Sequence, residues 1–170
     1  APVGAVTTAT LSVDLRSLLD QRNEVIELEQ LAANIYGSTA PLLPEAALQA
    51  KANEFRMGAE RGRDAARELM RMVGGRPAPA KQSLAGVLGA AKGALSAGRS
   101  GRFGTLKNLQ DMLLAAFLTA AAWTMMQQAA YGIGDRRLIE TAEREARLKS
   151  LPYQWLLTTV AERTPWAMLL

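Results

Sequence analysis

Between residues 48 and 73, apolar and small side chains recur at alternating steps of four and three residues without a break. The set is Leu48, Ala52, Phe55, Ala59, Gly62, Ala66, Leu69 and Val73. This spacing is a heptad seam, which gathers the side chains on one face of an α-helix. Because the middle of the seam is alanine and glycine, we expect a neighbouring element to approach this helix closely there.

The rest of the chain also favours helices. Alanine and leucine carry most of its apolar content, and both are good helix formers. We predict main helices over residues 12–36, 45–73, 106–131 and 136–163 of one 170-residue domain. Gly37 is expected to end the first helix, and Gly132 and Gly134 the third. Asp135 is expected to cap the fourth helix, and Pro152 to break or kink it.

The connection over residues 76–105 is long and rich in glycine, alanine, serine and proline. Several of its apolar residues nevertheless keep helical spacing, which predicts a short crossover helix. They are Leu84, Val87, Leu88, Ala91 and Leu95. A connection that crosses from one end of a bundle to the other gives a topology different from simple up-down-up-down order.

Two absences limit the chemistry. The chain has no cysteine, which excludes disulfides, thiolate metal sites and cysteine nucleophiles. It also has no histidine, the commonest general base and transition-metal ligand.

The net charge of +4 is compatible with anionic partners but too small to choose among them. The arginines on the second helix alternate with acidic residues. We therefore do not expect nucleic-acid binding.

Two apolar segments need a covering surface. No charged residue occurs from Met112 through Gly134, a length that could cross a bilayer, but alanine content and two glutamines favour a buried central helix. The tail over residues 164–170 is also apolar and predicts docking onto the bundle or onto a partner. The candidate interaction residues are Trp155, Trp166, Met168, Leu169 and Leu170.

Short motifs in a fixed order resemble the ferritin-like bacterial stress proteins of the YciF type. They are Glu29-Gln30-Leu31, Gly74-Gly75-Arg76-Pro77, Ala129-Ala130-Tyr131-Gly132 and Gly134-Asp135. The resemblance covers about Leu15 to Arg163. It implies an all-α, ferritin-like four-helix bundle with a long central crossover and an extra C-terminal helical segment.

The same resemblance implies that the metal ligands of the family are missing. Such sites need inward-facing carboxylates and Glu-x-x-His pairs. Where the family has an E-H-Y-E run, this chain has the run from Thr124 to Gln127, and Gly58 and Arg61 fill ligand-like positions on the second helix. The residual carboxylate candidates are Glu29, Glu54 and Glu143. We read these as surface groups and expect neither a metal nor another cofactor.

These expectations combine into a non-catalytic, cytoplasmic bundle that acts as a self-associating or accessory structural subunit. Its partner would be a second copy or another protein subunit. Two alternatives stay open: iron handling or oxidation through an all-carboxylate site, and a membrane-associated subunit that uses residues 112–134 or the C-terminal tail.

Overall fold

The computed structural model describes the backbone of residues 4–73, 85–86, 88–89 and 99–169, and within these ranges the side chains from residue 16 onward except 70, 72 and 73. All the described elements are helical. They are α1 (Gly4–Thr39), the 3₁₀ helix η1 (Ala40–Leu42), α2 (Ala46–Val73), α4 (Gly101–Ile133) and α5 (Arg136–Met168). The predicted all-helical architecture is confirmed for the part of the chain that is described.

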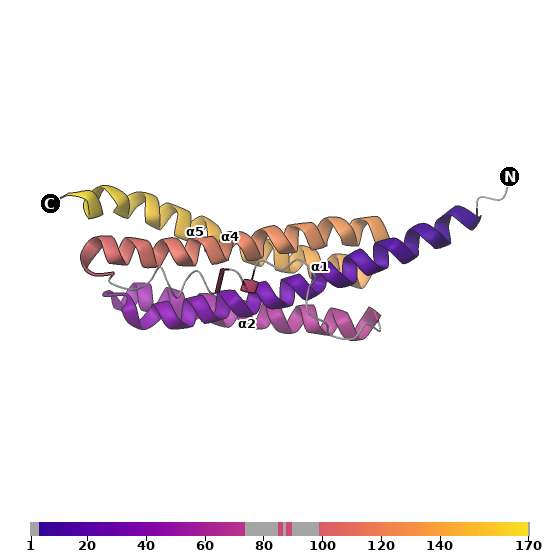
Figure 1. The fold of residues 1–170 in the computed structure, drawn as a ribbon, viewed down its shortest axis with the longest axis horizontal. Helices are drawn as coiled ribbons and strands as arrows, with labels where there is room; N and C mark the ends of the chain where they lie inside the picture. The colour runs from indigo at the N-terminus through magenta and orange to yellow at the C-terminus, as the bar shows by residue number, and fades with distance from the viewer. Residues whose placement is uncertain (1–3, 74–84, 87, 90–98, 170) are drawn as a thin grey trace.

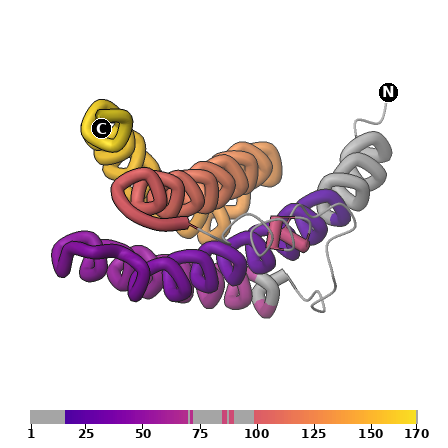
Figure 2. Tube along the Cα trace, turned by 60° about the vertical axis from the view of Figure 1, so that its left-hand side comes forward, coloured from indigo at the N-terminus to yellow at the C-terminus, as the bar shows by residue number. Residues whose placement is uncertain are grey.

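The four long helices form two antiparallel pairs, α1 with α2 and α4 with α5 (Figures 1 and 2). The pairs meet mainly where α1 packs on α4, whereas α2 and α5 touch only briefly. The first half of α2 shares a core with the first half of α4, so these two helices run parallel. The end of α2 and the start of α4 consequently lie at opposite ends of the bundle, so the residues between them join its two ends (Figure 1).

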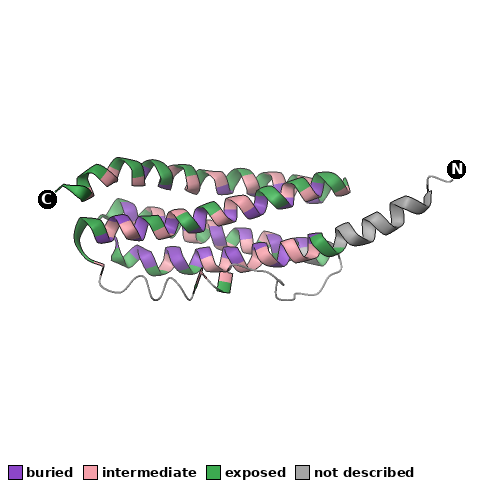
Figure 3. Cartoon of the chain, turned by 45° about the horizontal axis from the view of Figure 1, so that its top comes forward, coloured by how far each residue is buried: buried purple, intermediate pink, exposed green. Residues whose placement is uncertain are grey.

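The apolar core consists of two clusters, one toward each end of the bundle. One cluster surrounds Phe55 and Leu109, and the other surrounds Trp123 and Leu69. Figure 3 shows buried positions along the facing sides of all four helices. The polar residues discussed below lie between these clusters.

The heptad seam predicted on α2 is confirmed. Its residues from Leu48 to Leu69 are all buried, and only the side chain of Val73 lies outside the described set. The caps of the last two helices are also as expected. Gly134 adopts the left-handed conformation, with a φ of 77°, at the end of α4. The Asp135 carboxylate then accepts a hydrogen bond from the Leu138 amide at the start of α5.

Several predicted boundaries were wrong. Helix α1 begins at Gly4 rather than residue 12 and continues through Gly37 to Thr39, where the buried residues Tyr36 and Thr39 hold its last turn in place. An added Cβ at Gly37 would lie 3.1 Å from Arg56 Cδ. Helix α4 begins at Gly101 rather than residue 106, which shortens the crossover. Helix α5 continues through Pro152 to Met168, so most of the predicted tail is helical. A proline removes one backbone hydrogen bond, and the buried residues Leu156 and Thr159 hold the following turns in place.

The crossover helix predicted over 84–95 falls largely outside the described residues. Of that segment, residues 85–86 and 88–89 are helical. Ala85 packs against the second core cluster, and Gly89 lies near the Leu31 side chain of α1. These contacts place the described part of the connection against the bundle.

Helix α4 is long and apolar enough to cross a membrane by length and composition, as the core helix of a soluble protein also can be. Its buried side packs on α1 and α5. It is not packed on all sides as expected for a central helix, because Leu114, Phe117 and Met125 on its other side are exposed.

Candidate functional site

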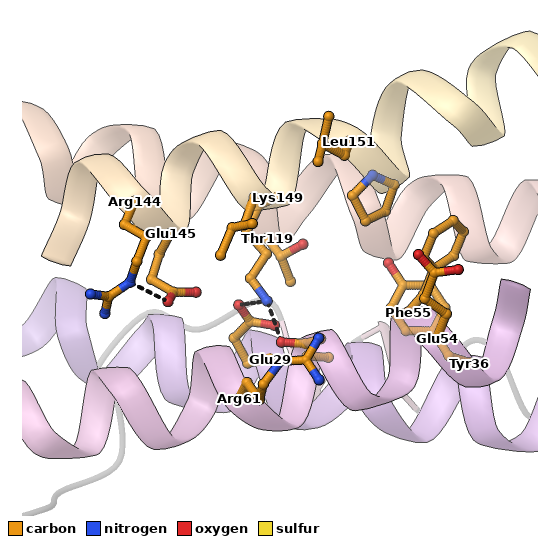
Figure 4. Close-up of a pocket in the computed structure, with 14 residues that line it drawn as sticks. Glu29, Tyr36, Glu54, Phe55, Arg61, Thr119, Arg144, Glu145, Lys149 and Leu151 are labelled. Atoms are coloured by element: carbon orange, nitrogen blue, oxygen red, sulfur yellow. Dashed lines mark hydrogen bonds and ion pairs between the residues drawn. The ribbon is translucent and has the colours of Figure 1, made fainter.

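A buried ion pair at the middle of the bundle connects all four long helices. The Lys149 ammonium of α5 lies 2.7 Å from Oε1 of Glu29 on α1. The same oxygen accepts a hydrogen bond of 2.8 Å from the Trp123 indole Nε1 of α4. Lys149 also donates to the carbonyl oxygen of Gly58 on α2, at 2.8 Å. Figure 4 shows Glu29 and Lys149 facing each other between the helices.

Gly62 makes room for this pair. A Cβ atom at this position would lie 2.3 Å from Glu29 Oε1 and 2.5 Å from Lys149 Nζ, closer than real Cβ contacts allow. The small middle of the α2 seam was predicted to admit a close neighbouring helix. What occupies the space is instead a carboxylate from α1 and an ammonium from α5.

The environment of Glu29 opposes its ionisation. The residue is 1% exposed. Burial raises the pKa of Glu29 to about 7, although the charge and hydrogen bond of Lys149 and the hydrogen bond from Trp123 act in the opposite direction. Burial also raises the pKa of Tyr36, one of the residues around the same cavity, and the Glu29 charge adds to that effect.

Two buried polar groups lack partners in the part of the chain that the structure describes. Glu29 Oε2 accepts no hydrogen bond from a described residue, in contrast to Oε1. Arg22, two helical turns before Glu29 on α1, is 2% exposed, and none of its guanidinium nitrogens has an acceptor among the described groups. Burial therefore lowers the pKa of Arg22. Such groups are costly, because an unpaired polar atom loses its hydration without compensation.

The three carboxylates considered as metal ligands do not meet. Glu54 is exposed and pairs with Lys51 at 3.0 Å, and Glu143 accepts a hydrogen bond from the exposed Tyr131 hydroxyl. Only Glu29 is buried. Across the described ranges, no three acidic side chains gather in a way that could hold a metal ion.

The structure also describes the other residues that were compared with metal ligands. Met126 is buried in the second core cluster, whereas Thr124 and Met125 face solvent. Gly58 and Arg61 both border a cavity beside the ion pair. The carbonyl of Gly58 thus receives a hydrogen bond from Lys149 at a position where the resemblance implies a metal ligand.

Sequence reasoning missed Lys149, although a signal was present. The buried stripe of α5 includes Leu138, Ala142, Glu145, Lys149 and Leu156, and the first four follow steps of four, three and four. Applying the alternating steps of four and three from α2 to α5 would therefore have placed Glu145 and Lys149 in the core.

The cavity beside the ion pair has a volume of about 320 Å³. It lies between α2 and α5, and Leu151 and Pro152 form part of its wall. Its polar lining also includes Tyr36, Thr119, Glu54, Arg144 and Glu145.

A second hollow is an apolar groove on the outer side of α4 and α5, with a volume of about 730 Å³. Its apolar lining is Phe103, Leu113, Leu114, Phe117, Tyr153 and Leu157. Four of these side chains, Phe103, Leu114, Phe117 and Leu157, are between 46% and 49% exposed. This arrangement leaves exposed apolar side chains in a groove that Arg99, Lys107, Gln110 and Asp111 also line.

The predicted interaction residues divide into two groups. Trp155 packs edge-on against Phe55 of α2, with ring centroids 5.5 Å apart. Its ring therefore contacts its own bundle. Trp166, Met168 and Leu169 are exposed at the end of α5. Leu170 lies outside the described residues.

No protein-family model matches this chain, and no curated protein or solved structure matches it. The geometry of the buried pair and of the apolar groove is therefore the basis for assigning a function.

Proposed function

We propose that this chain is a metal-free, ferritin-like bundle that acts as a self-associating structural subunit. The observation that carries the proposal is the apolar groove between α4 and α5, which no part of the described chain covers. Apolar faces of this kind on a folded protein are typical of association surfaces.

The ferritin-like part of the proposal is supported by topology. Parallel α2 and α4, joined by a connection that spans the bundle, are the arrangement expected of a bundle with one long crossover. The metal-free part is supported by Lys149, because an ammonium placed against the one buried candidate carboxylate occupies the position a cation would need.

A second copy is the partner that fits the groove best, because the chain supplies both a hollow and a projecting apolar side chain on one side of α5. Met168 follows Leu157 by eleven residues, about three helical turns, and so projects from the same side of the helix. In a twofold pair, each copy would contribute the same apolar face to the contact.

Light scattering after size-exclusion chromatography, with elemental analysis of the same peak, tests both parts. We expect a metal-free dimer or larger assembly. Phe117→Glu and Leu157→Glu should dissociate it, since a buried unpaired carboxylate is costly. Met57→Glu is the control, because Met57 is 46% exposed on α2 but does not line the groove. A concentrated wild-type protein that stays monomeric would refute self-association, and stoichiometric metal would refute the metal-free site.

A membrane-associated subunit is the second candidate, favoured by the length and composition of α4 together with its exposed apolar side. The same preparation distinguishes the two. A protein that purifies and assembles without detergent supports the soluble subunit, whereas one that requires detergent supports the membrane alternative.

A further inference from the structure

The cavity between α2 and α5 has the size and lining of a small-molecule site. Its volume of about 320 Å³ would hold about ten water molecules. Apolar side chains form much of the wall, and they are Phe55, Ala59, Leu148, Leu151 and Pro152. Polar groups converge on the floor around Glu29 and Lys149. Ligand sites in proteins typically combine such walls with a few placed polar groups.

The balance of charges around this cavity favours an anion. Each of its three carboxylates already has a cationic partner: Glu29 pairs with Lys149 at 2.7 Å, Glu145 with Arg144 at 3.4 Å, and Glu54 with Lys51 at 3.0 Å. Arg61 borders the cavity and takes part in no ion pair or hydrogen bond among the described residues. The border of the cavity therefore carries one exposed guanidinium that has no ionic partner among the described residues.

Lys149 adds a second donor. Its ammonium has three N–H groups, of which one is accepted by Glu29 Oε1 and another by the Gly58 carbonyl oxygen. The third has no acceptor in the described part of the chain. Lys149 lines the cavity, and its two contacts and its burial hold the ammonium in one place there.

We propose that the cavity binds a small organic carboxylate, whose anionic group is held by Arg61 and Lys149 and whose apolar part contacts Phe55 and the Leu148–Pro152 turn. Arginine and lysine both form charge-assisted hydrogen bonds with carboxylates, and these are stronger than neutral ones. Leu148, Leu151 and Pro152 of α5 line the cavity together with Phe55 of α2, and they supply the surface for the apolar part. This inference does not depend on self-association, because the cavity lies away from the groove between α4 and α5.

Isothermal titration calorimetry with three probes of similar shape and different charge tests the proposal. Benzoate carries the carboxylate, benzyl alcohol is neutral and benzylamine is cationic. We expect benzoate to bind at least about tenfold more tightly than either of the others, the difference that one charge-assisted contact produces. Equal or tighter binding of benzyl alcohol or benzylamine, or no binding of any probe, would overturn the proposal.

Arg61→Gln identifies the site. Arg61 is exposed, so the substitution should leave folding intact while weakening benzoate binding by about tenfold. Arg67→Gln is the matched control, since Arg67 lies on the same helix, pairs with Asp64 at 3.6 Å and does not border the cavity. Unchanged benzoate affinity in Arg61→Gln, or an equal loss in Arg67→Gln, would show that benzoate binds elsewhere. Light scattering of Arg61→Gln should give the wild-type assembly, which separates this test from that of self-association.

Discussion

Replacing Gly62 with alanine is the most direct perturbation of the buried pair. In an ordinary helix, Gly→Ala stabilises a protein by about 0.5–1 kcal/mol, because alanine restricts the unfolded chain and favours helix. At Gly62 the new Cβ would lie 2.3 Å from Glu29 Oε1 and 2.5 Å from Lys149 Nζ. Both side chains are buried, so neither can move away freely.

The expected cost follows from these contacts. Inserting a methyl group into a filled core costs about 1–3 kcal/mol. If the methyl group also separates the ion pair, the uncompensated charges add to the free-energy cost. Complete separation of a buried ion pair costs about 3–5 kcal/mol. Partial separation, offset by the helix propensity of alanine, gives a net loss of about 2–4 kcal/mol.

Urea unfolding followed by circular dichroism measures this loss. With a slope of about 2 kcal/mol per molar urea, the midpoint should fall by about 1–2 M. Gly58→Ala is the control on the preceding turn of α2, because an added Cβ there meets nothing closer than Arg61 Nη2 at 3.8 Å. That variant should be stabilised by about 0.5–1 kcal/mol. The reasoning fails if both variants raise the midpoint equally.

Three further predictions concern buried charges. Lys149→Met should cost about 3–5 kcal/mol by leaving Glu29 without its cation, while the double variant Glu29→Met/Lys149→Met should recover most of this in the same urea assay; equal losses would mean that the two charges are not coupled. Because the folded pKa of Glu29, about 7, lies above its ordinary value of 4.5, its contribution is fully present below pH 4.5 and is lost as the pH rises through 7. The unfolding free energy of the wild type relative to Glu29→Gln should therefore fall by up to about 3 kcal/mol over that range, and a difference independent of pH would contradict the raised pKa. Arg22→Met should raise stability by about 1 kcal/mol or more, because it removes an unpartnered buried guanidinium, whereas Arg16→Met on the exposed part of α1 should leave stability unchanged; a large loss in Arg22→Met would reveal an acceptor in the part of the chain that is not described.

The fold was predictable because its main signals are local. The α2 seam, the Gly134 stop and the Asp135 cap each depend on residues close together in sequence, and all three are found in the structure. The errors at Gly37 and Pro152 share a different cause. A glycine or proline lowers the intrinsic stability of a helix by a few kcal/mol at most, and tertiary packing on either side offsets that loss.

The site was harder to predict because the sequence alone does not distinguish a charged residue on the buried face of a helix from one on the exposed face. On α1, the buried positions Leu18, Arg22, Val25, Glu29 and Ala32 follow steps of four and three, yet Glu29 was read as a surface group, which was wrong. That Glu29 meets Lys149 follows from the packing of α1 opposite α5, which no local pattern specifies. Glu29 was thus considered only as a surface group or a residual metal ligand, and Lys149 was not named at all.

The buried ion pair bears on how the four helices are aligned along the bundle axis. Alanine and leucine seams can slide by a helical turn at small cost, because similar side chains replace one another at the contact. The Glu29 carboxylate cannot slide in this way, since its ionised form requires Lys149 from α5 and Trp123 from α4, while Lys149 requires the Gly58 carbonyl and the space at Gly62 on α2. A shift of any one helix by a turn would leave a charge buried without its partner, at a cost of several kcal/mol. The contacts of the pair therefore join all four helices at one level, and a one-turn shift of any of them would break at least one of these contacts.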